Sequence, residues 1–218
     1  MTFNVNADCL RAAAICQSNE ETRYYLRGVY IEPHAVAGVL LVATDGHRMV
    51  VIHDETGFCD KPVIVGLDKD ALKATKKDKR EREARRVVSD AEGEVWVNDC
   101  HGGKLTYVKD PIVDGTFPDW RRVLPGKSQS VANPDVSLQW FNADYLAAFG
   151  DVATALEGTS GRTFKGIRIE PGYNGGPALV RFGHRADAFG VIMSVRATNF
   201  DEGIPDFVYA TPELAKAA

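Results

Sequence analysis

The chain has 218 residues, of which 44% are hydrophobic and 26% are charged, an ordinary composition for a folded protein of one or two domains. Its formal net charge of −4 excludes a uniformly basic nucleic-acid binder, although a local basic segment can still bind phosphates. Four cysteines without a C-x-x-C pair predict reduced thiols, and neither a signal peptide nor an apolar run of the ~20 residues that span a membrane is visible. These features predict a cytoplasmic protein.

An internal repeat organises the chain. Residues 6–13 (NADCLRAA) return as residues 142–148 (NADYLAA), and residues 28–33 (GVYIEP) return as residues 166–171 (GIRIEP). The two pairs are separated by nearly the same number of residues, which indicates duplication of one structural unit. Residues 65–74 (VGLDKDALKA) form a weaker copy between them.

Each copy predicts the same order of elements: a short strand, an Asn or Asp that caps a helix of about three turns, and three further strands. The three further strands are predicted at 24–32, 39–44 and 48–53 in the first copy, at 86–88, 94–97 and 104–108 in the second, and at 164–170, 178–182 and 189–195 in the third. The short first strands are predicted at 3–5, 63–65 and 136–140.

The predicted fold is therefore α+β, built from three β-α-β-β-β units with helices on one face and antiparallel sheets on the other. Residues 1–125 are expected to form a domain of two units whose helices pack side by side. Residues 126–133 read as a linker, 134–200 as a third unit, and 201–218 as a tail. The predicted core of the first domain comprises Leu10, Ala13, Val29, Ile31, Leu41, Val51, Leu72, Val95 and Val123.

The segment VATDGHRMVV (42–51) carries an acid, an imidazole and a guanidinium between two apolar runs. Asp45-Gly46 is typical of a hairpin turn. A catalytic Asp45/His47 pair is the weaker interpretation, because no nucleophile motif accompanies it. A zinc site from His53, Cys59, Cys100 and His101 does not have the usual ligand spacing. We therefore expect no enzyme activity, no metal and no cofactor.

A basic segment, residues 68–86, contains nine Lys/Arg and five Asp/Glu. If it forms one helix, Lys69, Lys73, Lys76 and Arg80 share a face. One interpretation is a solvated helix with internal ion pairs. The other is sequence-independent contact with the phosphate backbone of DNA through Lys69, Lys73, Lys76, Lys77 and Arg80.

Two segments, TRYYLRGV (22–29) followed by VATDGHRM (42–49), and DGTFPDWRRVLP (114–125), closely resemble the middle domain of the bacterial DNA polymerase III beta subunit, the sliding clamp. The third unit resembles half of the last domain of that family. The resemblance implies a ring-forming replication and processivity factor whose helices face double-stranded DNA. It also implies a groove for short peptides of polymerases and repair proteins, and a homo-oligomer.

Carried over to this sequence, the resemblance assigns thirteen residues to the peptide groove. They are Leu26, Thr44, Gly46, His47, Arg48, Met49, Pro118, Arg122, Val123, Val191, Met193, Val195 and Arg196. Of these, Leu26, Met49, Val123, Met193 and Val195 are expected to form one exposed apolar depression. The tail residues 204–209 are a candidate occupant.

Two departures from the family keep a second function open. The chain has three units where the family has six, and its third predicted helix carries Asp144, Asp151 and Glu157 but no Lys or Arg. The alternative to a DNA-encircling clamp is an adaptor or decoy that binds clamp clients without DNA.

Overall fold

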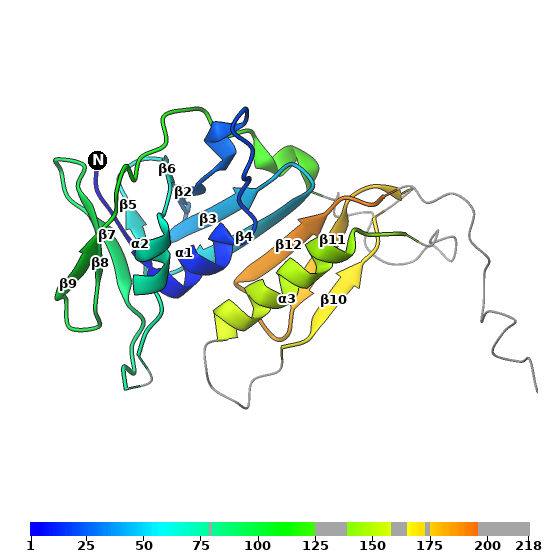
Figure 1. Ribbon diagram of the computed structural model, residues 1–218. Coiled ribbons are helices and arrows are strands. Elements are labelled where there is room, and N and C mark those ends of the chain that lie inside the picture. The colour runs from blue at the N-terminus through cyan, green and yellow to red at the C-terminus, as the bar shows by residue number, and fades with distance from the viewer. Residues whose placement is uncertain (79, 125–138, 158–164, 173–174, 196–218) are drawn as a thin grey trace, which may run out of the picture.

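The computed structural model describes residues 1–78, 80–124, 139–157, 165–172 and 175–195 (Figure 1). The predicted linker, the predicted tail and most of the short first strand of the third unit lie outside these residues. None of the described helices is long and apolar enough to cross a membrane.

The described elements follow the predicted order. The first unit contains β1 (Phe3–Asn6), α1 (Ala7–Ala14), the 3-10 helix η1 (Tyr24–Leu26), β2 (Val29–Pro33), β3 (Val39–Thr44), β4 (Arg48–Asp54) and β5 (Phe58–Cys59). The second contains β6 (Val63–Val65), α2 (Lys69–Ala74), β7 (Arg86–Ser89), β8 (Val95–Asn98), β9 (Lys104–Tyr107) and the 3-10 helix η2 (Trp120–Val123). The third contains α3 (Ala143–Glu157), β10 (Ile167–Glu170), β11 (Ala178–Phe182) and β12 (Ala188–Ile192).

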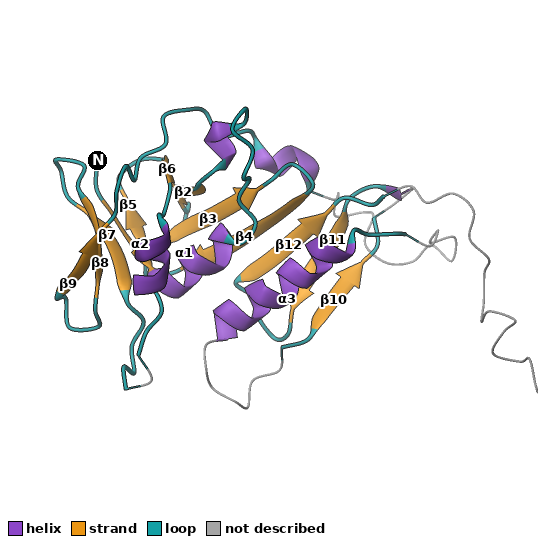
Figure 2. Ribbon diagram, viewed as in Figure 1, coloured by secondary structure: helices purple, strands orange, loops and turns teal. Residues whose placement is uncertain are grey.

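The strands form two antiparallel sheets, with the α-helices on one side of them (Figure 2). One sheet has the order β5-β1-β7-β8-β9, and the other has the order β10-β11-β12-β4-β3-β2-β6. The first and second units exchange their first strands, because β1 pairs with β7 of the second unit and β6 pairs with β2 of the first. The third unit extends the larger sheet by pairing β12 with β4. The α+β architecture predicted from the repeat, with antiparallel sheets and α-helices on one face of them, is confirmed.

Local capping explains where the helices begin. The Asn6 side chain accepts hydrogen bonds from the backbone N–H groups of Asp8 and Cys9, and Asp68 caps α2 in the same way through Asp70 and Ala71. The Asn142 side chain accepts the Asp144 N–H at 2.8 Å at the start of α3. Each of the three helices therefore begins at an Asn or Asp cap, as the repeat predicts.

The helices differ from the prediction in length. Helices α1 and α2 span eight and six residues, shorter than three turns. Helix α1 packs along α3 of the third unit and also reaches the end of α2 through Arg11 (Figure 1). Arg11 of α1 joins all three helices, because its guanidinium donates to the carbonyl oxygens of Thr75 and Ala155.

Most of the predicted core is buried, but two residues differ. Leu72 is only half-buried, at the rim of the core. Val123 is 44% exposed, because η2 lies over the outer face of the larger sheet and turns this side chain outward. Its neighbour Trp120 is the residue of η2 that packs inward.

Candidate functional site

The VATDGHRMVV segment forms the β3–β4 hairpin, as its turn pair predicts. Asp45 Oδ1 accepts hydrogen bonds from the backbone N–H groups of His47 and Arg48, each at 2.9 Å. Gly46 has φ of +91°, a left-handed conformation that an L side chain adopts only with strain. The acid and the glycine therefore shape the turn.

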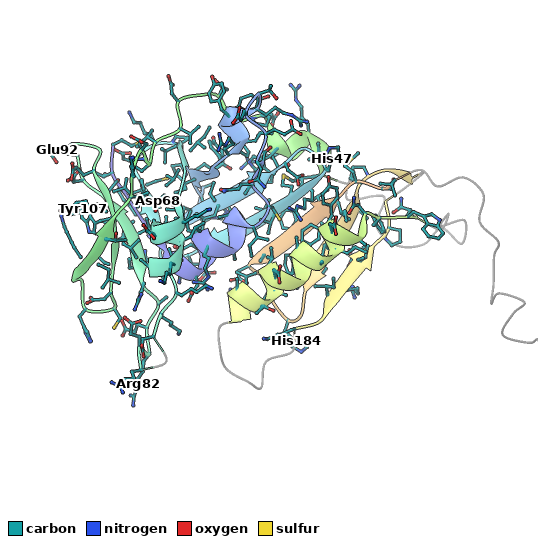
Figure 3. The ribbon with its side chains drawn as sticks, in the orientation of Figure 1. His47, Asp68, Arg82, Glu92, Tyr107 and His184 are labelled. Carbon is teal, nitrogen blue, oxygen red and sulfur yellow. The ribbon has the colours of Figure 1, made fainter. Side chains whose placement is uncertain are left out.

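The two basic side chains of the hairpin contact the third unit. Arg48 forms an ion pair with Asp45 at 3.0 Å, donates to the carbonyl of Ile15, and lies over the ring of Tyr145 on α3. His47 stacks on the same ring, with centroids 5.7 Å apart, and its carbonyl accepts the N–H of Met193. Figure 3 shows His47 at the end of the hairpin, beside α3 and β12. Tyr145 thus links the hairpin to the third unit, a role that its sequence position alone did not indicate.

The apolar side chains predicted for the groove divide into a buried and an exposed group. Leu26, Met49 and Val191 are 3–4% exposed, within a cluster beneath η1 and η2. The expectation that Leu26 and Met49 are exposed is therefore wrong, because segment 113–124 covers this side of the sheet. Val123, Met193 and Val195 are 40–44% exposed. The cluster also contains Phe117, which stacks on Tyr30 with ring centroids 4.7 Å apart, and Trp120.

The remaining groove residues lie around this cluster. Thr44 and Gly46 belong to the hairpin, where Thr44 Oγ1 accepts the Gly46 N–H. Pro118 is exposed, and Arg122 is exposed and pairs with Asp119 at 3.1 Å. Arg196 lies outside the described residues. The described members of the predicted set thus belong to η1, the β3–β4 hairpin, the segment around η2, and β12 with the residues that follow it.

The described residues give no geometric support to a zinc site or to a cysteine nucleophile. Within the described ranges, no group of three or more His, Cys, Asp or Glu side chains is arranged to hold a metal ion. Burial raises the pKa of the Cys9 and Cys16 thiols to about 12, and that of Cys59 to about 11. Thiols with such pKa values stay protonated at neutral pH and are poor nucleophiles.

The basic segment contributes to a hollow on the helix side of the molecule. A cavity of about 930 Å³ opens between the three helices. Six Lys or Arg side chains and two Asp side chains line it, a formal balance of +4: Arg11, Lys69, Lys73, Lys76, Lys77, Lys165, Asp8 and Asp151. Lys165, which precedes β10, was not predicted.

The basic segment does not form one helix, because α2 ends at Ala74, so the condition for Lys69, Lys73, Lys76 and Arg80 to share one helix face is not met. Lys76 and Lys77 follow the end of α2 and still line the hollow, whereas Arg80 does not. Arg80 lies on the loop toward β7, and Figure 3 shows Arg82 at the tip of this loop, away from the helices. Arg85 of the same loop donates to the Ala74 carbonyl at 2.7 Å and so holds the loop against the end of α2.

Asp68 fixes the helix that presents Lys69 and Lys73. One carboxylate oxygen accepts the backbone N–H groups of Asp70 and Ala71, and the other accepts the N–H of Lys109 at 3.0 Å. These hydrogen bonds, the one from Ala71 first, lower the pKa of Asp68 below its ordinary value. Figure 3 shows Asp68 beside α2.

Comparisons with known proteins agree with this architecture. No protein-family model matches the chain. The beta sliding clamp of Vibrio cholerae is 32% identical over 167 residues, which cover 72% of this chain and 39% of that protein. The beta sliding clamp of Escherichia coli K12 is 29% identical over 165 residues, covering 73% of this chain and 40% of that protein. The chain therefore spans about two fifths of the length of these curated relatives.

Solved structures show the same fold. The ligand-bound DNA polymerase sliding clamp of Pseudomonas aeruginosa superposes with a TM-score of 0.62 at 18% identity, covering 90% of this chain and 66% of that one. The DnaN sliding clamp of Bartonella birtlesii, bound to griselimycin, gives a TM-score of 0.60 at 22% identity, with 90% and 66% covered. The chain is a relative of the bacterial beta sliding clamps and corresponds to part of their length.

Proposed function

We propose that this protein is a non-catalytic, clamp-like replication and processivity factor of the cytoplasm, which contacts double-stranded DNA through its helix side and binds client peptides at the junction around the β3–β4 hairpin. The observation that carries the DNA contact is the +4 hollow between the three helices. Cationic side chains that neutralise phosphates release counterions, so such contact is independent of sequence and sensitive to salt.

The lysines of this surface are suited to phosphate contact because, in the part of the chain that the structure describes, none of them forms an ion pair. Lys69, Lys73 and Lys76 are exposed and point from α2 and the turn after it. Arg11, by contrast, pairs with Asp8 at 2.7 Å and donates to helix carbonyls, so its role is structural.

The experiment is a titration of a short linear DNA duplex at several salt concentrations. The triple variant Lys69→Glu, Lys73→Glu and Lys77→Glu should lower affinity and reduce the slope of log K against log salt by about 2.7, since each lost phosphate contact removes about 0.9. The control triple Arg27→Glu, Lys61→Glu and Lys104→Glu changes net charge equally outside the hollow. Equal losses for both triples would contradict a localised DNA site.

For the peptide site, the exposed apolar side chains Val123 and Met193 are the proposed anchors. Exposed apolar side chains beside an arginine favour a partner site, because they are costly to leave in water. A short peptide with an apolar and aromatic end should bind with micromolar affinity, about −8 kcal/mol. Calorimetry should show that Met193→Ala weakens binding about tenfold, and Val36→Ala, a change at a loop residue 89% exposed, should leave it unchanged. Unchanged binding by Met193→Ala would place the peptide elsewhere.

A second candidate function is an adaptor or decoy that binds clamp clients without DNA. The observation in its favour is Asp151 of α3, which lines the hollow and opposes phosphate binding from the third unit. Peptide binding by the wild-type protein without measurable DNA binding at low salt would establish this alternative.

A further inference from the structure

The open edge of the larger sheet lies at β10. In the described part of the chain, β10 pairs only with β11, and the sheet order ends there. Both equivalent strands have two neighbours: β2 lies between β3 and β6, and β7 lies between β8 and β1. In each case the second neighbour is the first strand of another unit.

The side chains at this edge are more exposed than their equivalents, as expected for a strand with one neighbour among the described residues. The repeat GVYIEP/GIRIEP makes Val29 of β2 equivalent to Ile167 of β10, and Ile31 equivalent to Ile169. Val29 and Ile31 are fully buried, whereas Ile167 is 37% exposed and Ile169 is half-buried. The third unit therefore keeps apolar residues at positions that its equivalents bury.

Half of the backbone groups of β10 have no β-sheet partner among the described residues. The Gly183 N–H donates to the Gly166 carbonyl at 2.7 Å, and the antiparallel register then runs from Ile167–Phe182 to Glu170–Leu179. Because hydrogen-bonding direction alternates along a strand, the N–H and C=O groups of Ile167 and Ile169 point away from β11. This edge can accept a further antiparallel strand.

The segment that enters α3 has the position of such a strand. Trp140 pairs with Val195 just as Asn4 of β1 pairs with Phe58 of β5. The Gln139 side chain holds the segment in place, because it donates to the carbonyls of Gly172 and Gly176 and accepts the Gly172 N–H. In the first two units, the strand at this position belongs to the sheet of the other unit.

We propose that two copies of this chain complete a two-unit domain through their third units. Residues 139–142 of each copy would pair as an antiparallel strand with β10 of the other. A second copy fits because donor segment and acceptor edge occur in the same unit, so one two-fold axis satisfies both contacts at once. The arrangement repeats between chains the strand exchange that β1 and β6 make within one chain. It is independent of DNA and peptide binding.

The test is the molar mass of the 218-residue protein in solution, measured by light scattering during gel filtration. The wild type should have twice the 23.8 kDa of one chain, or a multiple of that dimer. Ile167→Pro removes an N–H group that does not bond to β11 but would bond to the second copy. This variant should therefore have half the molar mass of the wild-type dimer. Ile167→Lys, which leaves the backbone unconstrained, should do the same if the proline variant does not fold.

A control substitution away from β10 and a measurement of amide exchange in β10 show whether the effect is specific to this edge. Val36→Lys, which changes an apolar residue in the β2–β3 loop, should retain the wild-type mass. The amide proton of Ile169 should exchange slowly in the wild type and rapidly in Ile167→Lys. A monomeric wild type, or a dimer that survives both Ile167 substitutions, would overturn the proposal. The measurement contains no DNA and no peptide, so its outcome does not depend on the proposed function, which the binding experiments test separately.

Discussion

Removing the Asp68 carboxylate should destabilise α2 and the surface that it presents. Three backbone N–H groups donate to this side chain, two in the first turn of α2 and one at Lys109. Loss of an N-terminal cap costs about 1 kcal/mol, within a range of 0.5–2 kcal/mol, and leaving the Lys109 N–H without its acceptor adds about 1 kcal/mol. Asp68→Ala should therefore lower the free energy of unfolding by about 2 kcal/mol.

Two further variants separate these contributions. Asp68→Asn retains an acceptor for the first turn but places an amide where the Lys109 N–H donates, so it should lose about 1 kcal/mol. Asp70→Ala removes an acid from the same turn whose side chain does not cap the helix, and should lose only a few tenths of a kcal/mol. Urea denaturation followed by circular dichroism measures all three. An Asp68→Ala protein within 0.5 kcal/mol of the wild type would refute this reasoning.

The pH dependence follows from the lowered pKa of Asp68. The carboxylate binds protons less readily in the folded protein than in the unfolded chain, so its contribution is fully present above the ordinary aspartate pKa of about 3.9. The contribution should disappear as the pH falls through the lowered value. The difference in stability between the wild type and Asp68→Ala should therefore be constant near neutral pH and shrink in acid. A difference that grows on acidification would contradict the assigned role.

Met49→Ala should destabilise the protein by about 2–5 kcal/mol, since Met49 is 3% exposed within the cluster beneath η2, whereas Met193→Ala, at 40% exposure, should cost less than about 1 kcal/mol. Equal losses in denaturant titration would show that the two methionines have similar environments. Gly190→Ala should cost about 1–3 kcal/mol, because its Cβ would lie 2.5 Å from Cε1 of the fully buried Phe149. Gly150→Ala on α3, where a Cβ meets nothing within 4 Å, should instead raise the melting temperature.

The sequence by itself determined the repeat and the local structure. Asn6, Asp68 and Asn142 cap helices because their short acceptor side chains satisfy N–H groups two or three residues away. The strand segments also follow from local alternation, and the β3–β4 hairpin follows from Asp45-Gly46. The resemblance to sliding clamps rested on such contiguous segments, and relatives and solved structures confirm it.

Only the tertiary structure decided which surfaces these elements expose. The burial of Met49 and the exposure of Val123 depend on how η2 covers the larger sheet, through contacts far apart in the chain. The end of α2 at Ala74 reflects contacts with Arg11 and Arg85, which hold the turn after it, rather than the favourable helix propensity of the following lysines. Lys165 joins the basic hollow because β10 begins beside α3, a long-range arrangement that no local pattern encodes.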